Sequence, residues 1–180
     1  MYCGEIPAPP AHEEVYNVMV MENRVGGPSV PPNIISLDKA DVKIFSAATY
    51  TLLRTIPLPS PTLTYRGLGW VDLGETRHLI TLESGGGDVA LLLHEWHGIQ
   101  EQQGWRRIIL DVGGNRADNI SSRFLSVDHQ TKRVMFTDSA NDLLYVYGLV
   151  SEELFPLFNF YNTTTGKMTY LTRPTGVTGN

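Results

Sequence analysis

Residues 126–148, SVDHQTKRVMFTDSANDLLYVYG, contain the pattern that decides the expected fold of this chain. Short runs rich in Val, Phe, Tyr and Leu favour extended strands, and the small polar residues between them favour tight turns. The runs at 133–139 and 142–149 are too close together for a crossover helix. They therefore predict neighbouring antiparallel strands joined by a short turn.

The same organisation extends over most of the chain. Helical periodicity is scarce, and the best helix candidate, residues 91–105, is interrupted by Gly98 and Gly104. A hairpin-like ending is expected over residues 162–174. The twelve expected strands form three sets of four, at 15–22, 33–38, 42–47 and 51–58; at 67–73, 77–84, 88–96 and 105–112; and at 122–128, 133–139, 142–149 and 154–161.

Parts of the pattern repeat. The pair Val71-Asp72 recurs as Val127-Asp128, 56 residues later. An acidic residue also ends the second expected strand of each set, at Asp38, Glu83 and Asp138. A carboxylate at a strand end can accept hydrogen bonds from the N–H groups of the following turn. Repetition on this scale indicates units that bury their faces by stacking on one another.

Residues 126–146 resemble one blade of a β-propeller of the YWTD or NHL type. A strand closing in Val-Asp is followed by a polar link, an aromatic-rich strand ending in Phe136-Thr137-Asp138, a turn and a third strand. Residues 70–92 fit less closely, because Leu82-Glu83 replaces the Thr-Asp pair, and residues 33–45 fit loosely. The resemblance implies three to four four-stranded antiparallel blades, in a partial or small β-propeller. A β-sandwich is the alternative.

Such propellers usually have six blades. A compact four-bladed ring, a half-propeller completed by a second chain and a fragment of something longer all remain open. We expect an extended N-terminal arm at 1–14, one β-rich repeat domain at 15–176 and a C-terminal tail at 177–180.

Composition limits the classes of partner. Against 19 acidic residues there are 14 Lys and Arg, a net charge of −5 without a basic stripe, so no nucleic-acid partner is expected. No apolar run approaches the ~18 residues of a membrane span, and no secretory signal is evident, so we expect no membrane partner and an intracellular setting. The single cysteine, Cys3, excludes an intramolecular disulfide.

His94 and His97, with Glu95 between them, are the only close pair of histidines in the sequence. On a helix His94 and His97 would share a face and could hold a metal ion, whereas on a strand they point to opposite faces. We interpret them as a surface cluster at a strand end, which leaves both histidines as weak metal candidates. The glycine-rich segments 83–89 and 111–116 are interpreted as hairpin turns, since neither leads into a helix that would complete a phosphate site.

Propeller lactonases bind a divalent cation through Glu, Asn and Asp, which makes five carboxylates of this chain candidate ligands. No matching ligand set is present, and turn capping is the predicted role of Asp38, Asp72, Glu83, Asp128 and Asp138. No Gly-x-Ser-x-Gly elbow occurs. We therefore predict no catalytic residue and no cofactor.

The aromatic cluster at 153–161 is the predicted interaction surface, through Phe155, Phe158, Phe160 and Tyr161. The function expected is a non-enzymatic protein-binding or scaffold module, whose partner is another protein or a second copy of the chain. Two alternatives are a structural component of a large assembly, such as a virion or multisubunit complex, and a metal-dependent hydrolase or lactonase of the propeller type.

Overall fold

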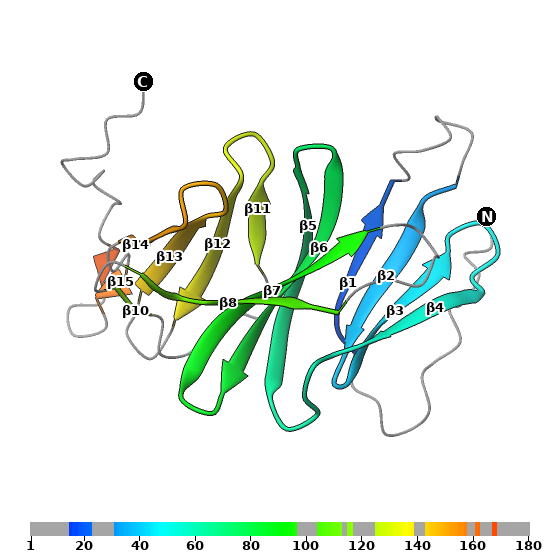
Figure 1. Cartoon of the computed structure of the whole chain (residues 1–180), viewed down its shortest axis with the longest axis horizontal. Helices are drawn as coiled ribbons and strands as arrows, with labels where there is room; N and C mark the ends of the chain where they lie inside the picture. Colours follow the sequence, from blue (N-terminus) through cyan, green and yellow to red (C-terminus); the bar gives the residue numbers. More distant parts are fainter. Residues whose placement is uncertain are drawn as a thin grey trace.

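The chain folds into three successive four-stranded antiparallel sheets, which are not closed into a barrel (Figure 1). The structure is a computed structural model that describes residues 15–22, 31–96, 104–112, 115–116, 125–138, 143–157, 161–162 and 167–168. Over these ranges the secondary structure is strand and turn without a helix, so the expected all-β class is confirmed. It follows that none of the described segments is a helix long and apolar enough to cross a membrane.

Each sheet joins consecutive strands in chain order. The first sheet comprises β1 (Val15–Met21), β2 (Asn33–Asp38), β3 (Asp41–Ser46) and β4 (Leu52–Pro57). The second comprises β5 (Thr64–Leu73), β6 (Thr76–Gly85), β7 (Asp88–Trp96) and β8 (Arg106–Ile109). The third comprises β11 (Ser126–Asp128), β12 (Arg133–Asp138), β13 (Leu143–Gly148) and β14 (Glu153–Leu157). Two short ladders join β9 (Asp111–Val112) to β10 (Asn115–Arg116), and β15 (Tyr161–Asn162) to β16 (Lys167–Met168).

The expected strands at 33–38 and 88–96 agree with β2 and β7 residue for residue. The glycine-rich segment 83–89 is a hairpin turn, as predicted, because Gly85 pairs with Asp88 between β6 and β7. In the segment 111–116, β9 pairs with β10 antiparallel, and the residues between them lie outside the described part of the chain. The expected strand at 105–112 is divided, because Leu110 lies in neither β8 nor β9. Leu110 is instead buried, and its N–H donates to the carbonyl of Val89 at 2.9 Å.

One hydrophobic core lies between each two successive sheets. The core between the first and second sheets contains Met21, Ile35, Leu37, Val42, Ile44, Ile56, Leu58, Tyr65, Leu68, Leu79 and Leu92. The core between the second and third sheets contains Val71, Ile80, Leu82, Val89, Leu91, Leu93, Leu110, Val134, Phe136, Tyr145, Tyr147 and Leu154. The second sheet is therefore covered on both faces.

The sequence of β7 shows how one strand serves both cores. Leu91 and Leu93 lie in one core and Leu92 in the other, because successive side chains of a strand point to opposite faces. All three leucines are at most 2% exposed. A continuous apolar run is what a strand buried on both faces requires.

The first strands of the three sheets lie next to one another, with β5 against β1 on one side and β11 on the other (Figure 1). Two glycines permit the approach of β11. A Cβ on Gly67 would lie 2.7 Å from the backbone nitrogen of Leu125, and one on Gly69 would lie 2.6 Å from its Cδ1. Gly67 also has a φ of 66° at an irregularity in the β5–β6 register, where the Thr81 hydroxyl donates to its carbonyl at 2.8 Å.

One turn geometry occurs twice between third and fourth strands. In the first sheet the N–H of Tyr50 donates to the carbonyl of Ser46 at 2.8 Å, and in the third the N–H of Glu152 donates to that of Gly148 at 2.8 Å. Tyr50 and Glu152 both have positive φ, 57° and 55°. The first and third sheets thus share a turn that the amino-acid types alone do not reveal.

Candidate interaction surface

The first sheet has one face against the second sheet and a second face that we call the outer face. Directly opposed residues on neighbouring strands share a face, so the register defines its members. They are Val15, Val18 and Val20 of β1, Ile34, Ser36 and Asp38 of β2, Asp41, Lys43 and Phe45 of β3, and Leu52, Thr55 and Pro57 of β4.

An apolar row crosses this face. Val20 opposes Ile34, Ile34 opposes Phe45, and Phe45 opposes Leu52. Val20 is 62% exposed and Leu52 is 52% exposed, while the two inner members are half-buried. Beside the row lies Val18, which is 52% exposed. Among the described residues the exposed large hydrophobic side chains concentrate on β1 and β4, and such concentrations mark binding surfaces.

The other end of the outer face carries a buried charge. Asp38 is 2% exposed. Its carboxylate forms an ion pair with the Lys43 ammonium at 2.6 Å and accepts a hydrogen bond from the Ser36 hydroxyl at 3.3 Å. Lys43 also lies 3.7 Å from Asp41. The acid and its base belong to the same face, so this end of the surface supplies its own counter-charge.

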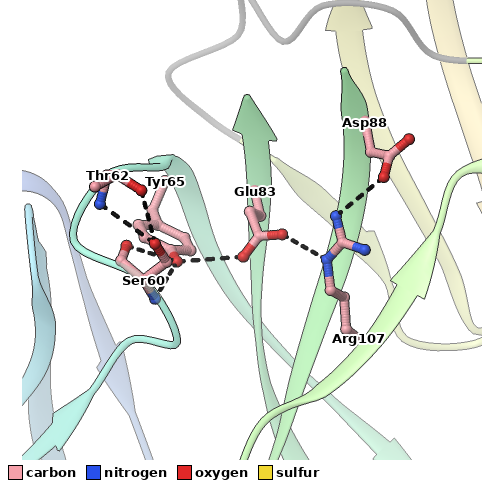
Figure 2. A network of polar contacts seen from close by, with 6 residues as sticks. All are labelled: Ser60, Thr62, Tyr65, Glu83, Asp88 and Arg107. Atoms are coloured by element: carbon pink, nitrogen blue, oxygen red, sulfur yellow. Dashed lines mark hydrogen bonds and ion pairs between the residues drawn. The ribbon is translucent and has the colours of Figure 1, made fainter. Parts of the chain in front are cut away.

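The face of the second sheet that corresponds to the outer face is the one that packs against the first sheet. This covered face also carries a buried acid. Glu83 is 1% exposed and accepts a hydrogen bond from the Arg107 Nε at 2.6 Å (Figure 2). Its second oxygen lies 3.2 Å from the hydroxyl of Tyr65. The other side of Arg107 reaches Asp88, at 3.6 Å.

The loop between β4 and β5 completes this network. The Tyr65 hydroxyl accepts the N–H of Ser60 at 2.9 Å and lies 3.0 Å from the Ser60 carbonyl, to which it can donate (Figure 2). Burial raises the pKa of Tyr65, and the hydrogen bond with Glu83 raises the pKa of Arg107. The phenol therefore stays neutral and can donate its one proton to the Glu83 carboxylate or to the Ser60 carbonyl. The guanidinium stays charged and donates to the carboxylate.

These contacts correct the predicted role of two carboxylates. Asp38 and Glu83 are not turn caps: each is buried and paired with a base of its own sheet, Lys43 on the neighbouring strand for Asp38 and Arg107 two strands away, on β8, for Glu83. Asp72 pairs with Arg77 across the β5–β6 hairpin. Asp128 does cap its turn as predicted, accepting the N–H groups of Gln130 and Thr131. The side-chain and backbone hydrogen bonds from Thr131 lower the pKa of Asp128. The side chain of Asp138 lies outside the described part of the structure.

A second polar junction connects all three sheets. The Arg77 guanidinium lies 3.9 Å from the centre of the Trp70 ring and donates to the carbonyl of Glu22, the residue after β1, at 2.7 Å. From the third sheet, the His129 ring lies 4.1 Å from that of Trp70. The junction orients the sheets relative to one another.

The histidine prediction is wrong for His94. This residue is 2% exposed, not on the surface, and its ring lies 5.0 Å from that of Trp105. His94 lies on the same face of β7 as the buried Leu92, which explains its burial. His97 lies outside the described residues. Within the described ranges, no group of three or more His, Cys, Asp and Glu side chains could hold a metal ion.

The predicted aromatic surface stays a prediction. Phe158 and Phe160 lie outside the described residues, and only the backbones of Phe155, in β14, and Tyr161, in β15, are described.

The outer face of the first sheet is not among the predicted surfaces, although the sequence of β1 indicates an apolar outer face. This sequence, VYNVMVM, places apolar side chains on both faces instead of alternating apolar and polar ones. A strand of this kind is expected to pack against another part of a protein on each of its two faces. No protein-family model matches the chain, and no curated protein is significantly similar to it.

Proposed function

We propose that the protein is a non-enzymatic binding module built from propeller-like β repeats, and that the outer face of the first sheet binds another protein. The observation that carries the proposal is the apolar row from Val20 to Leu52. It lies open on the first sheet, whereas the corresponding face of the second sheet is covered by a neighbouring sheet.

Three features support a propeller-like arrangement of the repeats. The strands follow chain order within each sheet, the first strands lie next to one another, and the turn at Ser46–Tyr50 recurs at Gly148–Glu152. In such an array each sheet needs a neighbour to bury its faces. A terminal sheet then presents an apolar face that a partner can cover.

Site-specific photo-crosslinking tests this function. A photoreactive amino acid replaces Val20, on the outer face, or Val150, which is 75% exposed but lies in the β13–β14 turn. We expect a defined protein adduct from position 20 and none from position 150 in cells that express the chain. Equal labelling from both positions, or no adduct from position 20, would contradict the proposal.

A further inference from the structure

We infer that the occupant of the outer face is an apolar β-sheet face of another protein. This inference rests on the proposed function, because it names the chemistry of the partner that binds the same surface. The first and second sheets are equivalent in register and in the arrangement of their charges. The covered face of the second sheet therefore shows what packs against residues at these positions.

The apolar row of the outer face has an equivalent row on the covered face of the second sheet. Ile34 and Leu79 each lie four residues before the buried acid of the same strand, Asp38 or Glu83. Each is opposed by one residue of the first strand of its sheet and by one residue of the third. These are Val20 and Phe45 for Ile34, and Trp70 and His94 for Leu79. We call Trp70, Leu79 and His94 the equivalent row.

The first strands of the two sheets share an irregularity at the same place. The register shifts between Val15 and Asn17 in β1 and between Arg66 and Leu68 in β5, so each strand contains one extra residue. In both sheets this shift lies between the buried acid and the row. An extra residue changes which side chains point to a face, so a matching shift keeps equivalent positions on the same face.

The charged ends of the two faces are also alike. On the outer face Lys43 lies 2.6 Å from the buried acid and 3.7 Å from Asp41. On the covered face Arg107 lies 2.6 Å from the buried acid and 3.6 Å from Asp88 (Figure 2). Each face thus holds one base between two acids. On the second sheet this arrangement is compatible with a sheet packed against the rest of the face.

The inner face of the first sheet covers the equivalent row. Leu79 is 0% exposed and His94 is 2% exposed. The residues that the first sheet contributes to this core are apolar: Met21, Ile35, Leu37, Val42, Ile44 and Ile56. Arg54, which opposes Ile44, is the only charged residue among the described members of this inner face. The partner of the outer face should therefore present a sheet with apolar side chains and few charges.

The covered face also shows why the occupant is a sheet and belongs to another protein. A second copy cannot offer its own inner face, because Ile35, Leu37 and Ile44 are 0% exposed beneath its own second sheet. Strands, not a helix, pack against the equivalent row, and two packed sheets lie about 10 Å apart. Another protein that contributes a sheet is therefore the occupant that the repeat of the two sheets specifies.

Photo-crosslinking with mapping of the joined residues tests the chemistry of the partner. In the full chain a photoreactive amino acid replaces Val18, Val20 or Leu52, and mass spectrometry locates the attachment sites on the captured protein. We expect sites at apolar residues two apart along a strand, because alternate residues of a strand share a face. Sites three and four residues apart would indicate a helix and would overturn the inference. An adduct that joins two copies of the chain would overturn it as well.

Val20→Lys measures the contribution of the apolar row to this contact. With the photoreactive residue at position 52, the substitution should lower the adduct yield roughly tenfold or more, because it places a charge against an apolar face. Val150→Lys is the matched control and should leave the yield unchanged. Thermal melting checks that both variants stay folded, as expected at positions that are already exposed.

An adduct yield that is insensitive to Val20→Lys would also overturn the inference. If position 20 still forms an adduct with another protein, but through a helix of that protein, the proposed function stands and only the sheet partner fails. If position 20 forms no protein adduct, the proposed function and the inference fail together.

Discussion

The outer face of the first sheet and the corresponding face of the second sheet are built from similar parts but have different surroundings. Each carries one acid that is almost fully buried and paired at 2.6 Å with a base of its own sheet. The face of the second sheet lies under the first sheet, whereas Val18, Val20 and Leu52 of the first remain open. The difference teaches that burial of the acid does not require a covering sheet, whereas burial of the apolar row does.

The largest expected effect comes from removing the base on either face. Arg107→Met leaves Glu83 buried without its counter-charge, and Lys43→Met does the same to Asp38. Each should cost about 3–5 kcal/mol in the free energy of unfolding, measured by chemical denaturation. Similar losses at both positions would support the view that the two faces are built alike.

Arg106→Met is the control for this pair. Arg106 lies beside Arg107 in the sequence, but its contact with Glu152 joins two side chains that are each 66% exposed. Exposed pairs contribute about 0.2–1 kcal/mol, so a small effect is expected. Equal losses from Arg106→Met and Arg107→Met would contradict the prediction. They would show that the burial of Glu83 does not increase the contribution of its ion pair to the free energy of unfolding.

The next effect concerns the close approach of the second and third sheets. Gly67→Ala combines a positive φ with a clash against the Leu125 backbone, and should cost about 2–4 kcal/mol. Gly74→Ala shares the strain, at a φ of 64°, but has no atom within 4 Å of the new Cβ. It should cost only about 1 kcal/mol. Thermal unfolding of both variants separates contact from strain, and equal losses would argue against the tight approach of β11.

A smaller effect is expected at the three-sheet junction. Arg77→Lys keeps the charge but loses the flat guanidinium that stacks on Trp70 and reaches the Glu22 carbonyl. We expect a loss of about 1–2 kcal/mol and a change in tryptophan fluorescence. Arg106→Lys should change neither property. Unchanged stability and fluorescence in Arg77→Lys would show that the packing of the three sheets does not depend on this junction.

High pH should destabilise the protein through two tyrosines that are buried between the sheets. Near neutral pH this effect is the smallest of those predicted. Burial is the largest cause that raises the pKa of both Tyr65 and Tyr147 above the ordinary value of 10.0. Their contribution to stability is fully present below pH 10 and is lost as the pH rises through the folded-state values. Melting temperatures should therefore fall above about pH 10, together with tyrosine ionisation followed by absorbance. Ionisation without loss of stability would contradict the burial of these phenols.

Strand positions could be predicted because local punctuation sets them. β2 and β7 are bounded by turn-forming residues that are visible in the sequence, and the Asp128 cap is a contact within three residues. The partner of Glu83 could not be found in this way. Arg107 lies 24 residues away and reaches Glu83 only through the sheet register.

The errors at the faces have a different origin. The sequence shows which side chains are apolar, but not which sheet covers them. The position of His94 beside Glu95 and His97 predicts a surface residue, but His94 is buried, with its ring against that of Trp105. The openness of Val18 and Val20 likewise follows from the arrangement of the sheets, not from residue type.

The position of the second sheet between two neighbours has a consequence for how the chain opens. In a stack where each layer touches only the next, opening begins at the ends. Amide hydrogens of β6 and β7 should then exchange with solvent last, after those of β3 and β13.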